Sequence, residues 1–198
     1  MINKHELYNA LNRLNIPKGK PVIIHTSLKA IGETEGGAEA LLEMLITYAE
    51  ENKNLICIPT HTWKTMVMDM NNPDSCLGVL PSLASKHPKG IRSMHPTHSI
   101  TVFGDRKRAE EFVKNEKNVD TPTNPGGAYG NIIKEDGYVL LIGVNQTKNT
   151  IYTVLKKCFR LKTASQKRRL KQKLFIKMAQ LKKDIFIGST MLHQVMFL

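Results

Sequence analysis

Cysteine and long apolar runs are both scarce in this sequence of 198 residues. Its three cysteines, Cys57, Cys76 and Cys158, lie far apart and form no C-x-x-C pair. This spacing predicts neither a disulfide framework nor a thiolate zinc site. No window reaches the roughly 18 uncharged apolar residues of a membrane span, and the opening residues lack the apolar stretch of a signal peptide. We therefore expect a cytoplasmic protein with no membrane partner.

Acidic residues are almost missing from the last quarter of the chain. Residues 151–198 carry 12 lysines and arginines against the single acid Asp184, whereas residues 1–150 carry 17 basic and 16 acidic side chains. Basic runs of this kind neutralise phosphates, so a nucleic-acid-binding function through residues 156–183 is an alternative to be weighed. The tail has few aromatic residues for base stacking and no recognisable binding motif, which argues against a specific nucleic-acid partner. Lysines around most of the helical wheel likewise disfavour a membrane-surface helix.

Hydrophobic periodicity predicts an α/β fold. Apolar residues at helical spacing predict helices over 5–14 and 36–51, and a charged helix over 105–115, with a short helix at 80–88. Uninterrupted β-branched runs predict buried strands, and these lie at residues 21–24, 55–58, 99–104 and 138–142. The strand-helix-strand order favours a mixed, largely parallel sheet with helices on both faces.

Polar side chains follow three of these strands at the point where each strand ends. His25, Thr26 and Ser27 follow the first strand, residues 59–63 follow the second, and residues 143–150 follow the strongest strand. Ligands of open α/β sheets bind beyond the carboxyl ends of the strands, so these residues are candidates for a binding site. Residues 92–99 add a guanidinium and several hydroxyls, a set that suits an anionic ligand.

Two other patterns have simpler interpretations. His61 and His95 lack the spacing and the third partner of a zinc site, so we predict no metal. Gly126 and Gly127 follow Asn124-Pro125, a combination typical of a turn, and we interpret them as a turn rather than as a phosphate cradle.

Five blocks in the first 150 residues together resemble the aminoglycoside 3-N-acetyltransferase family, in particular its Bacillus-like branch of antibiotic acetyltransferases. The blocks are H-T-S-L-K-A-I-G-x-x-x-G-G-A-E-A-L, P-T-H-T-W, R-S-x-H-P-T-H-S, P-G-G-A-Y-G-N-I and Y-V-L-L-I-G-V-N-x-x-x-N-T. Each block alone is common, but their order and spacing are specific. The family transfers acetyl from acetyl-coenzyme A to an amino group of a deoxystreptamine antibiotic, with no metal.

The resemblance implies a set of site residues. The expected coenzyme A contacts are Thr26, Ser27, Leu28, Lys29, Thr60, His61, Thr62, Arg92 and Ser93. We assign the acceptor site to Trp63, His95, Tyr129 and Asn149, and place Thr150 near the thiol. The acceptor amine must lose a proton, and the family uses a histidine for this in a block of the form N-T-x-x-H-x-x-E.

This chain departs from the family at that histidine. Asn149 and Thr150 begin the block, but Thr153 occupies the histidine position. A hydroxyl cannot take and return a proton near pH 7 as an imidazole does. The resemblance ends near residue 152, where the basic composition begins, and a one-nucleotide shift permits a back-translation that restores H-S-V-E-E-M after Tyr152.

We therefore interpret residues 1–152 as the N-terminal part of an acetyltransferase domain that is incomplete at its C-terminus. Residues 153–198 are interpreted as an out-of-frame tail, with a native basic extension as the alternative. The expected consequences are poor solubility and little or no acetyl transfer.

Overall fold

Three parallel strands form the centre of the sheet in the computed structural model, which describes residues 3–71, 73–119, 121–158 and 192–197. They are β1 (Pro21–Thr26), β2 (Leu55–Pro59) and β5 (Tyr138–Ile142), with β1 in the middle. The three buried runs are thus strands, and their parallel pairing confirms the expected crossover connections.

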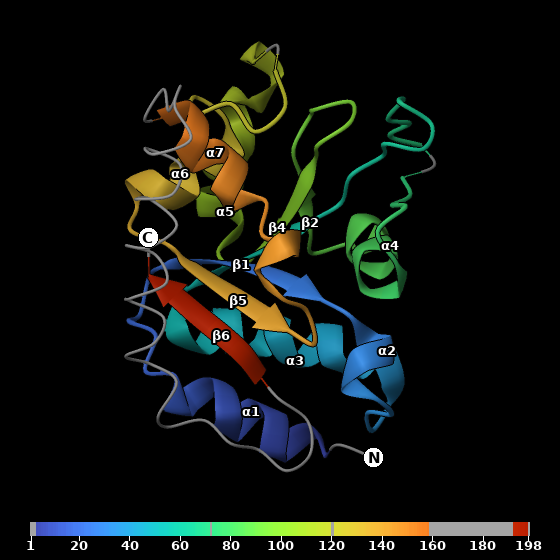
Figure 1. Ribbon diagram of the computed structural model, residues 1–198, viewed down its shortest axis with the longest axis vertical. Helices are drawn as coiled ribbons and strands as arrows, with labels where there is room; N and C mark the ends of the chain where they lie inside the picture. The colour runs from blue at the N-terminus through green and yellow to red at the C-terminus, as the bar shows by residue number, and fades with distance from the viewer. Residues whose placement is uncertain (1–2, 72, 120, 159–191, 198) are drawn as a thin grey trace.

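Antiparallel strands complete the sheet on both sides. β4 (Ile100–Phe103) pairs with β2, and β3 (Ile91–Arg92) pairs with β4. On the far side β6 (Leu192–Phe197) pairs with β5, so the strand order in the described residues is β3-β4-β2-β1-β5-β6 (Figure 1). The sheet is therefore mixed, as expected. β6 lies in the segment that we interpreted as out-of-frame, and that interpretation stays a prediction.

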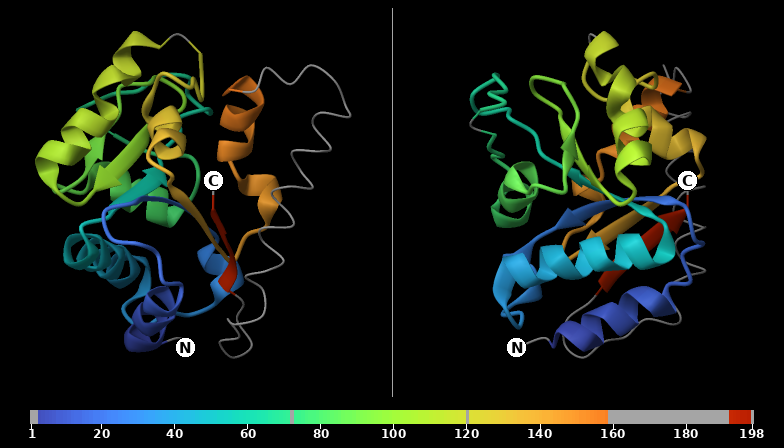
Figure 2. Two further views of the ribbon diagram at one scale, coloured as in Figure 1. Left: turned by 90° about the vertical axis from the view of Figure 1, so that its left-hand side faces the viewer. Right: turned by 180° about the vertical axis from the view of Figure 1, so that it is seen from behind.

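Helices cover both faces of the sheet (Figure 2). One face carries α1 (Lys4–Arg13), α3 (Gly37–Asn52) and α4 (Val79–Lys86). The other carries α5 (Arg106–Val113), α6 (Ala128–Lys134) and α7 (Ile151–Cys158). The shorter helical segments are α2 (Leu28–Ile31), η1 (Lys114–Asn118) and η2 (Gln146–Lys148).

Alternation along the central strands builds two separate apolar cores. In β1, Val22 and Ile24 pack with α1, α3 and α4, whereas Ile23 packs with α5, α6 and α7. Successive side chains of a strand point to opposite faces, so a strand covered on both faces has to be apolar throughout. This explains why all five residues of β2 and of β5 are buried.

The turn predicted at Gly126 and Gly127 is present, and a helix begins directly after it. The Gly127 N–H donates to the carbonyl of Asn124 at 3.0 Å, and α6 starts at the next residue. Gly130 has to be glycine because a Cβ there would lie 1.8 Å from the carbonyl oxygen of Pro125. A glycine inside a short helix weakens its sequence signal, which is why this helix was not predicted.

Within the described residues, no helix has the length and apolar character needed to span a bilayer.

Candidate functional site

The carboxyl ends of β2, β1 and β5 lie side by side and open into a cavity of about 700 Å³. The parallel register places His25 opposite Leu141 and Thr26 opposite Ile142. The loops that follow these strands therefore converge at one edge of the sheet, as the sequence predicted. The cavity wall consists of Ile24, His25, Thr26, Ser27, Pro59, His61, Trp63, Leu77, Pro81, His98, Pro122, Thr123, Val144, Thr147, Lys148, Asn149, Thr150, Thr153 and Lys157.

An aromatic cluster forms the side of the cavity next to β2. The His61 ring centroid lies 4.8 Å from that of Trp63 and 4.6 Å from that of His98. The Trp63 indole N–H donates to His98 Nε2 at 3.1 Å, so this nitrogen carries a lone pair and the His98 proton sits on Nδ1. His98 Nδ1 lies 2.9 Å from the hydroxyl oxygen of Thr97, which accepts this proton in a hydrogen bond. The half-exposed indole is thus fixed in orientation at the cavity.

Tyr129 fixes His61 from behind the cavity. The Tyr129 side chain is fully buried, and its hydroxyl lies 2.6 Å from His61 Nε2. The other ring nitrogen, His61 Nδ1, is buried without a partner, as is Nε2 of His25. Tyr129 therefore supports the cavity wall from the core of the protein rather than forming part of that wall.

The imidazoles of the cavity wall are neutral at pH 7. Burial lowers the pKa of His25 to about 4. Burial and, to a lesser degree, the neighbouring His98 lower the pKa of His61 to about 3, and burial lowers that of His98 to about 4. A general base works best with a pKa near the operating pH, so these rings are better suited to accept hydrogen bonds than to remove a proton from an amine.

One face of α7, together with Asn149 and Thr150 just before the helix, contributes the side of the cavity next to β5. Asn149 Oδ1 accepts the N–H of Ile151 at 3.1 Å and so caps the start of the helix. Thr150, Thr153 and Lys157 follow at spacings of three and four residues, which place them on one helix face, and all three line the cavity. Thr153, at the predicted histidine position, therefore faces the cavity from an exposed position.

Six of the predicted site residues meet at this cavity. They are Thr26, Ser27, His61, Trp63, Asn149 and Thr150. The others lie off the wall, namely Leu28, Lys29, Thr60, Thr62, Arg92, Ser93, His95 and Tyr129. Their assignment to a ligand stays a prediction.

Arg92 is engaged with the protein itself. Its guanidinium donates to the carbonyls of Thr60 at 3.1 Å and Asp74 at 3.2 Å, and to the hydroxyl of Ser99 at 3.1 Å. The Thr60 hydroxyl in turn lies 3.2 Å from those of Ser99 and Thr101. These bonds join β3, β4 and the end of β2, so the buried cation stabilises the loops beside the cavity.

Two lysines on the wall were missed as site residues. Lys148 lies in η2, and Lys157 lies in the segment that we interpreted only as basic tail. The spacing of Lys157 from Thr150 and Thr153 is the signal that identifies it once α7 is known to be a helix. Among the described residues no group of three or more His, Cys, Asp or Glu side chains is placed to hold a metal ion.

Comparison with known proteins places the chain in a family. The model of the family described as aminoglycoside 3-N-acetyltransferase matches residues 23–183. This match runs past residue 152, and the domain boundary that we placed there stays a prediction.

The chain is similar to two curated proteins. It is 23% identical to the SPbeta prophage-derived aminoglycoside N(3')-acetyltransferase-like protein YokD of Bacillus subtilis strain 168, over 75% of this chain and 62% of that protein. It is 26% identical to aminoglycoside N(3)-acetyltransferase IX of Micromonospora chalcea, over 71% of this chain and 55% of that protein. The match thus spans less than two thirds of the length of these curated relatives.

A solved structure shares the fold. The apoenzyme of aminoglycoside acetyltransferase AAC(3)-IVa superposes with a TM-score of 0.67 at 23% identity, over 79% of this chain and 60% of that chain.

Proposed function

Because the chain belongs to the aminoglycoside 3-N-acetyltransferase family, we propose that it binds acetyl-coenzyme A in the cavity but does not transfer the acetyl group to an aminoglycoside. The observation that carries this proposal is that Thr153 lies on the cavity wall. The resemblance implies that this is the position of the family histidine. The chain is thus an acyltransferase by family in which a threonine stands at the expected place of the proton acceptor on the described wall.

The reaction makes a specific demand on that position. A neutral amine attacks the thioester carbon, the carbonyl oxygen gains negative charge, and the thiolate leaves as the new amide loses its proton. The threonine hydroxyl does not ionise near pH 7, and the wall imidazoles have pKa values of about 3 to 4. An acceptor of the right basicity is therefore missing among the described residues of the wall.

The donors of the wall fit the chemistry of a coenzyme. Thr26 and Ser27 supply hydroxyls at the carboxyl end of β1, and Lys148 and Lys157 supply positive charge suited to phosphate groups. Thr150, at the start of α7, supplies a hydroxyl for the thioester end. Acetyl-coenzyme A would bring the activated acetyl group, while these side chains bind and orient it.

Two measurements on the full chain test this proposal. Coenzyme A at a hundredfold excess over its Kd is expected to raise the free energy of unfolding by about 3 kcal/mol, seen as an upward shift in Tm. Thiol release from acetyl-coenzyme A with an aminoglycoside present is expected to stay at the uncatalysed rate. Absence of the Tm shift, or turnover above the control, overturns the proposal.

A Thr153→His variant addresses the role of this position directly. The variant restores an imidazole on the cavity wall, and we expect thiol release with a small monoamine acceptor to rise above the rate of the unmodified chain. A Thr147→His variant is the matched control, because Thr147 also lines the cavity but lies outside α7. Equal rates for the two variants contradict the assignment of position 153.

Nucleic-acid binding is the second candidate function, and the charge of the tail favours it. Most of residues 156–183, the basic segment behind this alternative, lies outside the described residues. Binding of duplex DNA that falls steeply with salt and is unaffected by saturating coenzyme A would support a separate site on the tail.

A further inference from the structure

The cavity wall carries positive charge on one side and no negative charge on any side that the structure describes. Lys148 and Lys157 line it, and no aspartate or glutamate is among the described residues of the wall. In the last quarter of the sequence, Asp184 is the single acid. The fixed charges on the described wall are therefore all positive.

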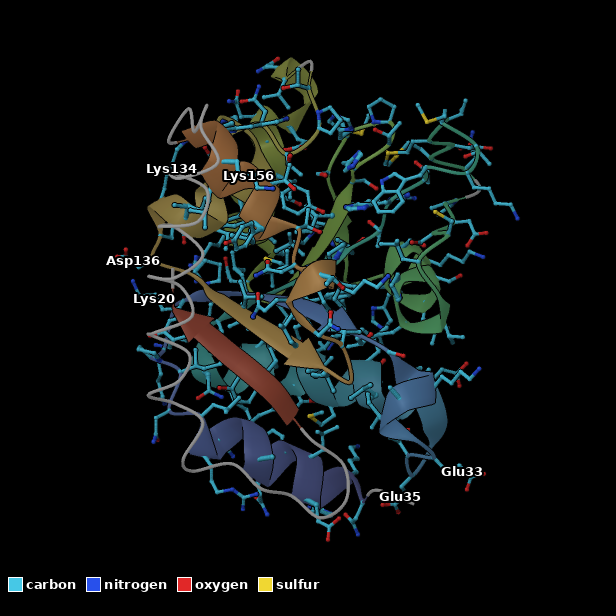
Figure 3. All side chains as sticks on the ribbon, in the orientation of Figure 1. Lys20, Glu33, Glu35, Lys134, Asp136 and Lys156 are labelled. Carbon is cyan, nitrogen blue, oxygen red and sulfur yellow. The ribbon has the colours of Figure 1, made fainter. Side chains whose placement is uncertain are left out.

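Lys157 owes its place to the geometry of α7. It lies one helical turn after Thr153 on the same face, and its ammonium group donates to the carbonyl of Pro122, another wall residue. The neighbouring Lys156 lies off the wall, with its Nζ 5.5 Å from the centre of the Tyr152 ring (Figure 3). Two adjacent lysines of one helix thus have different surroundings, and only Lys157 faces the cavity.

The histidines of the wall leave this positive charge unchanged. His25, His61 and His98 are neutral at pH 7, so they neither add positive charge nor offset that of the lysines. The charge of Lys157 also contributes to the lowered pKa of His98, which places this part of the wall within its field. A ligand in the cavity therefore meets hydroxyls, neutral rings and two ammonium groups.

We propose that this cavity is selective for anions: it binds a phosphate-bearing ligand through Lys148 and Lys157 and rejects polycationic amines such as aminoglycosides. A polycation in a site of this kind loses part of its hydration and faces like charges with no carboxylate to pair with. This inference rests on the proposed function in that coenzyme A is the expected anion. It goes further than the proposed function, because it states that aminoglycosides do not bind in this cavity, in addition to not being acetylated there.

Trp63 provides the means to test the selectivity. It is the single tryptophan of the chain and lines the cavity, so its fluorescence reports on occupancy. Coenzyme A, inorganic pyrophosphate and gentamicin are titrated separately into the full chain at low and moderate salt. We expect the two anions to change the fluorescence with a Kd that rises with salt, and gentamicin to give no saturable change and no displacement of coenzyme A up to about 1 mM.

Matched lysine variants show whether the cavity or the general charge of the chain is responsible. Lys157→Gln is expected to weaken coenzyme A about tenfold and to flatten the salt dependence, whereas Lys156→Gln, with the same change in net charge, changes the Kd less than about twofold. Lys157→Glu is expected to weaken coenzyme A further and to give gentamicin measurable affinity. Circular dichroism of each variant checks that α7 is retained.

Each outcome bears on one of the two proposals. Saturable gentamicin binding to the unmodified chain, or equal effects of Lys156→Gln and Lys157→Gln, overturns the anion selectivity of the cavity. Lys157-dependent binding of pyrophosphate without binding of coenzyme A retains the selectivity and overturns the proposed function.

Discussion

Acidification from pH 7 to pH 5 is expected to destabilise the protein through His25. The side chain is 8% exposed, its Nε2 has no partner, and burial lowers its pKa from 6.5 to about 4 in the folded state. Between these two values the unfolded chain binds a proton that the folded chain does not. The stability that depends on a neutral His25 is therefore fully present above pH 6.5 and is lost as the pH falls toward 4.

The size of the effect follows from the two pKa values. One pKa unit corresponds to about 1.4 kcal/mol, so His25 alone is expected to lower the free energy of unfolding by about 2 kcal/mol between pH 7 and pH 5. For a chain of this size this corresponds to a fall in Tm of roughly 4 to 8 °C. His61 and His98, whose pKa values are also lowered, act in the same direction.

Urea denaturation at a series of pH values measures this effect. The His25→Asn variant serves as the reference, because it keeps a polar side chain of moderate size but does not titrate in this range. The free energy of unfolding of the unmodified protein should fall by about 2 kcal/mol more than that of the variant as the pH falls from 7 to 5. Parallel pH profiles for the two proteins would refute the reasoning, since the lost stability would then come from other groups.

Three substitutions, one of them with a matched control, test contacts beside the cavity. Tyr129→Phe removes the hydroxyl that bonds His61 Nε2 and is expected to lower the free energy of unfolding by about 1 to 3 kcal/mol, measured by chemical denaturation. The control Tyr152→Phe removes a buried hydroxyl without a partner and should change the free energy of unfolding very little. Similar losses for the two variants would contradict the importance of the bond. Gly130→Ala brings a Cβ to 1.8 Å from a backbone oxygen and is expected to cost about 3 kcal/mol, or roughly 6 to 12 °C in Tm; an unchanged Tm would rule out this packing. Arg92→Lys keeps the charge but replaces two separate donor nitrogens, Nε and Nη2, by a single ammonium nitrogen, so we expect a loss of roughly 2 kcal/mol or more. A loss below about 0.5 kcal/mol would show that these bonds are dispensable.

Local sequence patterns were sufficient to predict the central strands and the longer helices, but not α6. We could predict the buried side chains from the apolar runs of β1, β2 and β5 and from the helical spacing of α3. Strands that are buried on both faces are typical of a parallel sheet covered by helices. Strand direction then places the three carboxyl ends together. For that reason the polar residues after each strand could be predicted to lie together at one edge of the sheet.

Only the tertiary structure decided how individual polar side chains are used. Arg92, expected at a ligand, is bound to two carbonyls and a hydroxyl, and Tyr129 is buried behind His61. Lys157, which belongs by composition to a basic tail, faces the cavity. Burial patterns depend on neighbours within one strand or helix and can be read from the sequence. The hydrogen-bond partners of a long side chain come from segments far apart in the sequence, and only folding brings them within reach.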